Sequence, residues 1–302
     1  MTPMRMIRVP LMLVAGAVAA FAASAPTHGE VIVETESLYH HIIVETDGSI
    51  RRLLFRRRGV DHSESAVDLS APLRPQMRYT ELMFSGLLYC PDPKDILVVG
   101  LGGGMLSGMF AHYFGDANVV TVELDPKVFE LAKGHFGFKE TGRGKVVVRD
   151  GRVYIKRALN KGAPRFDLIL LDAYRGGFIP YHLTTKEFFE ECKRALKPGG
   201  LVVSNMRTDF ETYDYQRRTI RKVFATCRAF QGGGNTVVCA LPVETKVAPD
   251  DLMKRARALQ EKHKFQFDLL GVADAYERKA DYKRHGPIFT DDYAPANILR
   301  RR

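Results

Sequence analysis

Three carboxylates in this sequence each follow a short run of apolar residues, as expected of residues at the ends of strands. Glu123 follows the run 119–122, Asp150 follows 146–148, and Asp172 follows 166–171. Carboxylates in these places can accept hydrogen bonds from ribose hydroxyls or from an adenine amino group, and can take a proton from a nucleophile. The structural alternatives are a helix N-cap for Asp150 and a cap of the next loop for Asp172.

A glycine cluster lies between the apolar run 96–99 and a predicted helix, and it contains Gly100, Gly102, Gly103 and Gly104. Glycines in such a loop let the backbone turn sharply and let a ligand approach closely. The order of strand, glycine loop, helix, strand and acid predicts a nucleotide site that also includes Gly151, next to Asp150. The alternative is a tight turn that binds no ligand.

The details of the loop favour an adenosyl-sulfonium ligand over NAD. Counted from Gly100, the dinucleotide pattern Gly-x-Gly-x-x-Gly has Met105 at its last glycine position. Glu123 after the second strand suits a ribose, and Asp150 after the third suits an adenine. We therefore expect S-adenosylmethionine or its decarboxylated form as co-substrate.

The elements that must position these residues alternate between strands and helices from residue 95 onward. Strands are predicted at 96–99, 119–122, 146–148, 166–171 and 201–204, with helices near 105–114, 126–134, 152–159 and 184–195. Continuous apolar strands separated by helices predict a parallel sheet covered on both faces. A helix at 213–224 and short strands at 227–230 and 236–240 complete an α/β fold. It is a doubly wound, mostly parallel seven-stranded sheet, Rossmann-like and of the class I S-adenosylmethionine-dependent methyltransferase type.

The two ends of the chain differ from this central pattern. Alternating residues from 31 to 55, with Asp47-Gly48 as a turn, predict a small N-terminal β-hairpin domain. A helix is predicted at 77–88 and another at 249–262. We divide the chain into a signal peptide or anchor (1–25), an N-terminal β-strand domain (30–75), a catalytic domain (76–245), and a C-terminal helix and tail (246–302).

The first 25 residues resemble a targeting segment. A basic start with Arg5 and Arg8 precedes an apolar stretch and an Ala20-Phe21-Ala22 cleavage pattern. This predicts export to the periplasm or anchoring in a membrane, with a cytoplasmic location as the alternative.

Composition limits the partners. Lys plus Arg is 45 and Asp plus Glu is 35, for a net charge of +10, which favours anionic partners. The arginine runs at 56–58 and 300–302 lack interleaved aromatic residues, so no specific nucleic acid is expected. The spacing of the four cysteines matches no zinc pattern, and no metal is expected. A turn centred on Gly233 would place Cys227 opposite Cys239, as a disulfide or as two buried thiols.

Several motifs resemble those of the polyamine aminopropyltransferases, the spermidine synthase family, and most of all its spermidine-synthase-like branch. They are the glycine loop 100–104, Val122-Glu-Leu-Asp125, Arg149-Asp-Gly151, Asp172-Ala-Tyr174, the segment 179–188 and the segment 290–295. The resemblance implies that Asp172 is the base that takes a proton from the attacking amine. Tyr79-Thr-Glu81 stands where the family has Tyr-His-Glu, so Tyr79 and Glu81 become candidate substrate residues. The resemblance also implies a homodimer.

Two positions depart from the family pattern. The family has an aspartate where Gly103 stands and a second aspartate where Arg175 stands, and these carboxylates would hold a cationic acceptor. Arg175 would repel a diamine. Asp291 and Asp292 are candidates to replace the lost acids, unless they form a solvated turn. His182 is a further candidate to contact the substrate, with a purely structural role as the alternative.

These observations predict a spermidine-synthase-like transferase that moves an aminopropyl group to a small-molecule amine or an unknown acceptor. The alternatives are a methyltransferase on the same fold and an exported binding protein without catalysis.

Overall fold

The computed structural model describes residues 29–160, 162 and 165–293. The targeting segment predicted for residues 1–25 lies outside these residues. No helix within the described ranges is long and apolar enough to cross a membrane.

A seven-stranded sheet forms the centre of the molecule. Its strand order is β10-β11-β9-β8-β5-β6-β7, and the strands are β5 (Asp95–Val99), β6 (Asn118–Glu123), β7 (Gly144–Val148), β8 (Phe166–Leu171), β9 (Leu196–Arg207), β10 (Thr226–Gly232) and β11 (Asn235–Leu241). Strands β5 to β9 pair in parallel, whereas β11 pairs antiparallel with both β9 and β10. The predicted fold class is confirmed.

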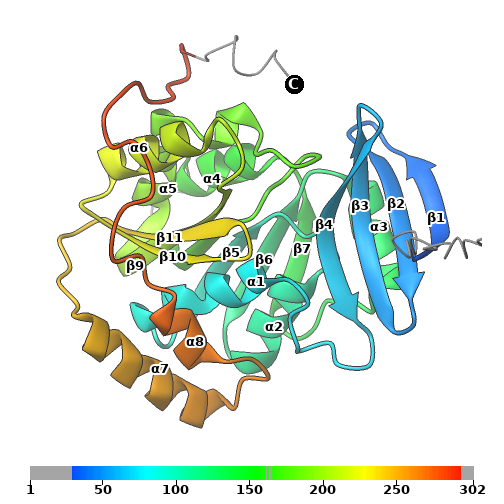
Figure 1. Ribbon diagram of the computed structural model, residues 1–302, viewed down its shortest axis with the longest axis horizontal. Coiled ribbons are helices and arrows are strands. Elements are labelled where there is room, and N and C mark those ends of the chain that lie inside the picture. The colour runs from blue at the N-terminus through cyan, green and yellow to red at the C-terminus, as the bar shows by residue number, and fades with distance from the viewer. Residues whose placement is uncertain (1–28, 161, 163–164, 294–302) are drawn as a thin grey trace, which may run out of the picture.

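Helices cover both faces of this sheet (Figure 1). Buried residues fall into two apolar clusters, one on each face. On one face lie α1 (Arg78–Met83), the 3₁₀ turn η1 (Phe84–Leu88), α2 (Met105–Tyr113), α3 (Pro126–His135), α7 (Pro249–His263) and α8 (Leu269–Asp274). On the other lie α4 (Gly151–Asn160), α5 (Lys186–Ala195) and α6 (Tyr213–Val223). This double layer explains why the central strands are apolar on both faces.

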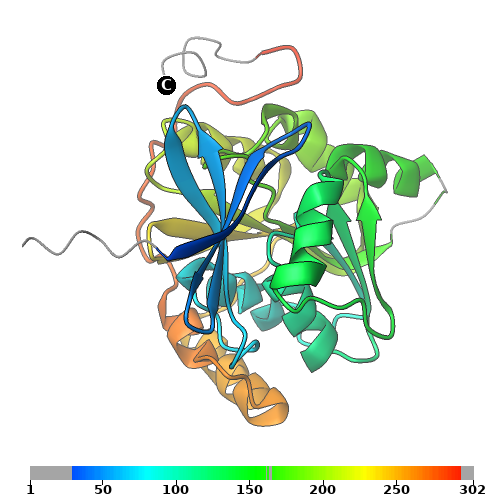
Figure 2. The same ribbon diagram turned by 90° about the vertical axis from the view of Figure 1, so that its right-hand side faces the viewer.

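The N-terminal part is a separate four-stranded antiparallel sheet rather than a hairpin alone. It contains β1 (Glu30–Glu36), β2 (His41–Asp47), β3 (Ile50–Arg57) and β4 (Val60–Asp68) in that order. It stands beside the larger sheet (Figures 1 and 2). Strand β4 is not predicted from the sequence, because its first five residues, Val60–Glu64, contain one apolar side chain and form no continuous apolar run.

The hairpin of β10 and β11 has a different register from the predicted one. Gly233 and Gly234 form a two-residue turn with positive φ values of 62° and 80°, so Cys227 pairs with Ala240 and Arg228 with Cys239. The predicted opposition of Cys227 and Cys239 is therefore wrong by one residue, which places them on opposite faces. All four cysteines are free thiols.

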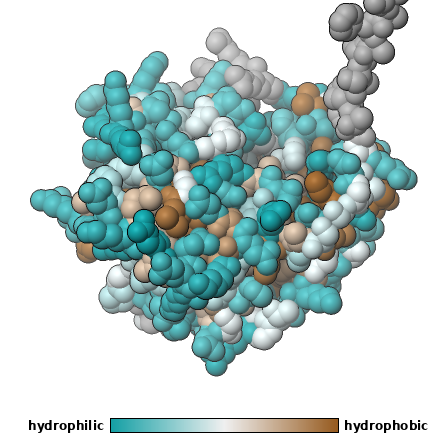
Figure 3. Space-filling model, turned by 60° about the horizontal axis from the view of Figure 1, so that its bottom comes forward, coloured by the Kyte–Doolittle hydropathy of each residue, from teal (hydrophilic) through white to brown (hydrophobic). Residues whose placement is uncertain are grey.

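The outer surface is mainly hydrophilic on the face that Figure 3 shows, with small separate apolar areas. The most exposed large apolar side chain in the described chain is Leu38, between β1 and β2. The features that bear on function lie inside the fold, where the two sheets meet.

Candidate active site

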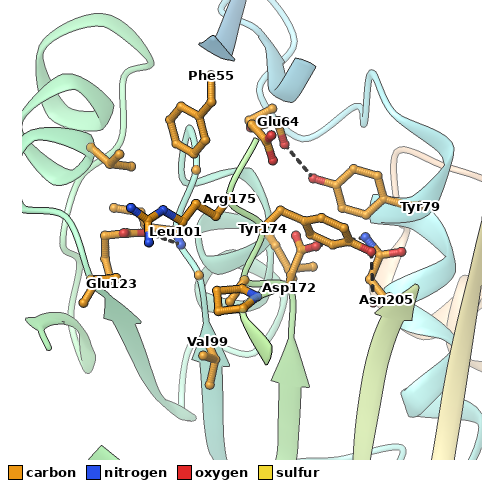
Figure 4. A pocket seen from close by; sticks show the side chains of 18 of the residues that line it. Phe55, Glu64, Tyr79, Val99, Leu101, Glu123, Asp172, Tyr174, Arg175 and Asn205 are labelled. Carbon is orange, nitrogen blue, oxygen red and sulfur yellow. Dashed lines mark hydrogen bonds between the residues drawn. The ribbon is translucent and has the colours of Figure 1, made fainter. Parts of the chain in front are cut away.

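A cavity of about 420 Å³ lies at the carboxyl ends of β5, β6 and β8, where the N-terminal sheet faces the larger one (Figure 4). Ligands of open α/β sheets bind at this edge. His40, Phe55 and Glu64 line it from the N-terminal sheet side, and Glu123, Asp150 and Asp172 from the strand ends. The sequence-predicted acids are thus brought together.

Glu123 lies at one side of the cavity and holds the glycine loop. Its Oε2 accepts a hydrogen bond from the Leu101 N–H at 2.9 Å, and its Oε1 accepts one from the Asp125 N–H at 2.9 Å. Burial raises the pKa of Glu123, while these two backbone donors act in the opposite direction. Each carboxylate oxygen has a second lone pair that can accept from a ribose hydroxyl.

The glycine loop requires glycine at two places. Gly100 has a φ of +102°, and a Cβ there would lie 2.3 Å from the carbonyl oxygen of Asp172. Gly104 has a φ of +84°, and its Cβ would lie 2.3 Å from the Phe138 ring. The first glycine therefore allows the loop to pass directly against the strand end that carries Asp172.

Asp150 both caps the start of α4 and lines the cavity. Its Oδ1 accepts from the Val153 N–H in the first turn of α4 at 2.9 Å, so the predicted capping contact is present. Its Oδ2 lies 2.8 Å from His182 Nε2. Burial opposes ionisation of Asp150, but the contacts with His182 and Val153 outweigh it and lower the pKa. Asp150 and His182 thus form one paired group on the cavity wall.

Asp172 lies at the other side of the cavity, at the end of β8. Its Oδ1 accepts a hydrogen bond from Asn205 Nδ2 at 2.9 Å, and Asn205 Oδ1 accepts one from Asn235 at 2.9 Å. Burial raises the pKa of Asp172 to about 7, although hydrogen bonding from Asn205 and Tyr79 pulls it down. A carboxylate with a pKa near neutrality is a competent general base at neutral pH.

A second carboxylate, Glu64 on β4, lines the same side of the cavity. Its Oε1 accepts from the Gly177 N–H at 2.9 Å, and its backbone carbonyl accepts from the Tyr79 hydroxyl at 3.2 Å. Burial raises its pKa to about 7, and the nearby charge of Asp172 adds to this effect. Figure 4 shows Glu64, Tyr79, Tyr174, Asp172 and Asn205 gathered on one side, away from Glu123.

Arg152 of α4 organises the region behind His182. Its guanidinium binds Glu191 at 2.8 Å and Asp291 at 2.7 Å, and Asp291 also accepts from the Thr185 hydroxyl at 2.7 Å. The Tyr181 hydroxyl lies against the carbonyls of Thr290 and Tyr293 and can donate to either. Through these hydrogen bonds the segment 289–291 holds in place the start of α5 and the loop that carries His182.

Comparison with known proteins agrees with this geometry. The family described as "Spermine/spermidine synthase domain" matches residues 76–246. The polyamine aminopropyltransferase of Vibrio vulnificus (strain CMCP6) is 32% identical over 276 residues, which are 89% of this chain and 91% of that protein. The chain belongs to the spermine/spermidine synthase family.

Solved structures show the same fold. A spermidine synthase in complex with the transition-state analogue AdoDATO has a TM-score of 0.61 at 22% identity, covering 81% of this chain and 84% of that one. Human methyltransferase-like protein 13 in complex with SAH has a TM-score of 0.55 at 26% identity, covering 73% of this chain and 99% of that one. The family is one of transferases, and the comparisons give no support to a binding protein without catalysis.

Of the residues that the sequence singled out, most line the cavity. They are Tyr79, Gly100, Gly102, Glu123, Asp150, Gly151, Asp172, Arg175 and His182. Gly103 and Gly104 do not line it but sit against Phe136 and Phe138.

Three candidate substrate residues lie elsewhere. Glu81 forms an ion pair with Arg78, one turn earlier in α1. Asp291 and Asp292 are absent from the cavity wall, because the Arg152 guanidinium and the Thr185 hydroxyl hold Asp291 behind it. The structure therefore does not bring these aspartates to the cavity wall, and their replacement of the acids lost at positions 103 and 175 stays a prediction.

Sequence reasoning missed Glu64 and Asn205, and it named Tyr174 only as part of a family motif. Asn205 follows the predicted strand 201–204 in the way that Asp172 follows its own predicted strand, so the strand-end argument would have found it. Glu64 carries no such signal, since it lies within a polar strand. No group of three or more His, Cys, Asp or Glu in the described ranges could hold a metal ion.

Proposed function

We propose that this protein transfers an aminopropyl group from decarboxylated S-adenosylmethionine to an amine acceptor. The observation that carries the proposal is the position of Asp172, a carboxylate whose pKa is near 7, in the same cavity as Glu123 and the glycine loop. Family membership supports it, because relatives such as the Vibrio vulnificus protein are named polyamine aminopropyltransferases.

Each side of the cavity has a separate task in this proposal. Glu123 accepts from the ribose hydroxyls, Asp150 accepts from the adenine amino group, and Gly100 and Gly102 allow close approach of the donor. The Asp172 carboxylate orients the acceptor nitrogen and takes its proton. The nitrogen lone pair forms a bond to the aminopropyl carbon next to sulfur, as the bond between that carbon and the sulfur breaks. The bonding pair goes to sulfur and leaves a neutral thioether, 5′-methylthioadenosine.

Holding the acceptor nitrogen in line with the carbon–sulfur bond of the donor accounts for most of the rate enhancement in such a reaction, since the sulfonium sulfur is already a good leaving group. Asn205 fixes Asp172 through one oxygen at 2.9 Å, and the carboxylate keeps further lone pairs that can accept from the acceptor nitrogen. The backbone contact between Gly100 and Asp172 sets the distance between donor loop and base.

The direct test supplies the purified protein with decarboxylated S-adenosylmethionine and a panel of amines, and measures release of 5′-methylthioadenosine. A parallel reaction with S-adenosylmethionine measures S-adenosylhomocysteine. Release of the thioether from the decarboxylated donor supports the proposal. Formation of S-adenosylhomocysteine alone favours the second candidate, methyl transfer, which the similarity to the human methyltransferase bound to SAH supports.

A further inference from the structure

A β-bulge in β4 takes Glu64 out of the regular alternation of the strand. On β3, Leu53 pairs with Ser65. Leu54 then pairs with Ser63, so Glu64 has no partner across the ladder. Successive side chains of a regular strand point to opposite faces, whereas Ser63, Glu64 and Ser65 all line the cavity. A bulge next to an active site can re-aim a side chain in this way, and it explains why a strand residue between two serines of the wall also faces the cavity.

Three contacts hold Glu64 and its neighbour in this position. The Gly177 N–H donates to Glu64 Oε1 at 2.9 Å, and the Tyr79 hydroxyl donates to the Glu64 backbone carbonyl at 3.2 Å. Ser65 packs against the glycine loop, where a Cβ on Gly102 would lie 3.2 Å from the Ser65 Cβ. The Glu64 carboxylate is thus fixed relative to both the glycine loop and the turn that contains Gly177.

The Glu64 carboxylate lies with the proposed base rather than with the acid of the donor side. Figure 4 shows Glu64 and Asp172 on the same side of the cavity, away from Glu123. Both side chains are half-buried. Burial raises the pKa of Glu64, and the charge of Asp172 raises it further, which agrees with two carboxylates that face one space.

Neutral groups hold these two carboxylates. Glu64 accepts from the Gly177 N–H, and Asp172 accepts from the Asn205 side-chain amide. In the part of the chain that the structure describes, neither acid forms an ion pair with a lysine, an arginine or a histidine. An ammonium group beside them would relieve their mutual repulsion and gain charge-assisted hydrogen bonds.

Two arginines of the cavity wall do not provide that positive charge. The Arg207 guanidinium binds both oxygens of Asp209, at 3.0 and 2.6 Å. The Arg175 side chain extends toward Leu101 and Glu123 (Figure 4). The space beside the two carboxylates is therefore suited to a cation that belongs to a substrate.

We propose that Glu64 determines acceptor specificity by binding a second ammonium group of the acceptor, while Asp172 takes the proton from the reacting nitrogen. This rests on the proposed aminopropyl transfer and adds a residue that selects the acceptor. An acceptor with two amines satisfies both carboxylates, whereas a monoamine leaves Glu64 without a cation. Loss of the Glu64 charge should therefore change the choice of acceptor more than it changes the reaction itself.

Two matched pairs of amines test the proposal. 1-Aminopentane is putrescine with a methyl group in place of one ammonium, and 1-aminohexane is cadaverine changed in the same way. With saturating decarboxylated S-adenosylmethionine, release of 5′-methylthioadenosine should give a kcat/KM for the better diamine that is about tenfold or more above that of its monoamine. Glu64→Gln keeps the shape and the acceptor for Gly177 but lacks the charge, so it should remove most of this preference. The ratio within a pair cancels any effect of the variant on the shared base.

Glu36→Gln is the matched control, because the Glu36 side chain is 79% exposed on β1 of the same sheet. It should leave the preference unchanged. Calorimetric binding of the same four amines to the complex with 5′-methylthioadenosine repeats the comparison without turnover. If no amine releases the thioether, the proposed aminopropyl transfer fails, and the calorimetry still decides whether Glu64 selects a second ammonium.

Two results would overturn the proposal. The first is a wild-type protein that does not prefer the diamine in either measurement, which leaves aminopropyl transfer intact if the thioether is released. The second is a Glu64→Gln variant that keeps the wild-type preference. If that variant instead binds decarboxylated S-adenosylmethionine more weakly relative to 5′-methylthioadenosine, which lacks the ammonium, Glu64 belongs to the donor.

Discussion

Replacing Asp172 with asparagine should lower activity and raise stability in the same protein. Asparagine keeps the shape of the side chain but cannot take a proton, so turnover should fall by ~10²–10⁴. Affinity for 5′-methylthioadenosine should change little, because Asp172 lies on the acceptor side of the cavity.

The stability effect follows from the pKa. Asp172 moves from an ordinary value of 3.8 to about 7 in the folded protein. The folded state therefore retains a proton that the unfolded state has released, and the free energy of unfolding falls as pH rises from about 4 to about 7. Each unit corresponds to 1.36 kcal/mol, so this shift of about three units costs up to ~4 kcal/mol above pH 7. The asparagine side chain cannot ionise and avoids that cost.

Urea denaturation of both proteins at pH 4.5 and pH 8, together with the pH profile of turnover, measures these effects. The stabilisation by Asp172→Asn should be small at the lower pH and largest at the higher one. Wild-type turnover should rise with pH toward about 7, with an apparent pKa that Asp172 and Glu64 share. Equal differences in stability at both pH values, or unchanged turnover, would refute the reasoning.

Two other predictions concern the donor side and the network behind it. Glu123→Ala should weaken binding of 5′-methylthioadenosine by ~1–3 kcal/mol through loss of charge-assisted hydrogen bonds; calorimetry that finds equal affinity would remove Glu123 from the donor site. Arg152→Met should lower the free energy of unfolding by up to ~3–5 kcal/mol, because the buried Glu191 would lose the guanidinium that binds both of its oxygens and keep only the exposed Lys156 at 3.5 Å. The double variant with Glu191→Gln should recover part of this loss, and denaturation curves that show no loss in the single variant would contradict the argument.

The sequence predicts the central sheet well, because its strands are continuous apolar runs separated by amphipathic helices. Strand β8 has the predicted bounds, and helices α2, α3 and α6 differ by one residue. The predicted acids meet in one cavity because the carboxyl ends of parallel strands lie along one edge.

The failures have a physical cause in common. Strand β4 has no apolar run, and the Cys227 register depends on a turn one residue different from the predicted one. Glu64 lines the cavity because a separate sheet packs against the larger one. Asp291 lies outside the cavity wall, where it forms an ion pair with Arg152. Contacts between residues far apart in the sequence determine these four features. A local sequence pattern contains no information about such contacts.

The contribution of β2–β4 to the cavity has a consequence for the family region itself. Residues 76–246 match the family, but the cavity wall also includes His40, Phe55 and Glu64, and Phe289 and Asp291 secure its far side. A fragment of residues 76–246 would lack the cavity wall formed by the N-terminal sheet and the segment around Asp291 that holds the opposite side in place. The matched region is therefore not a transplantable module: the smallest unit that contains the cavity wall and the segment that holds it extends from His40, just before β2, to Asp291, which binds Arg152.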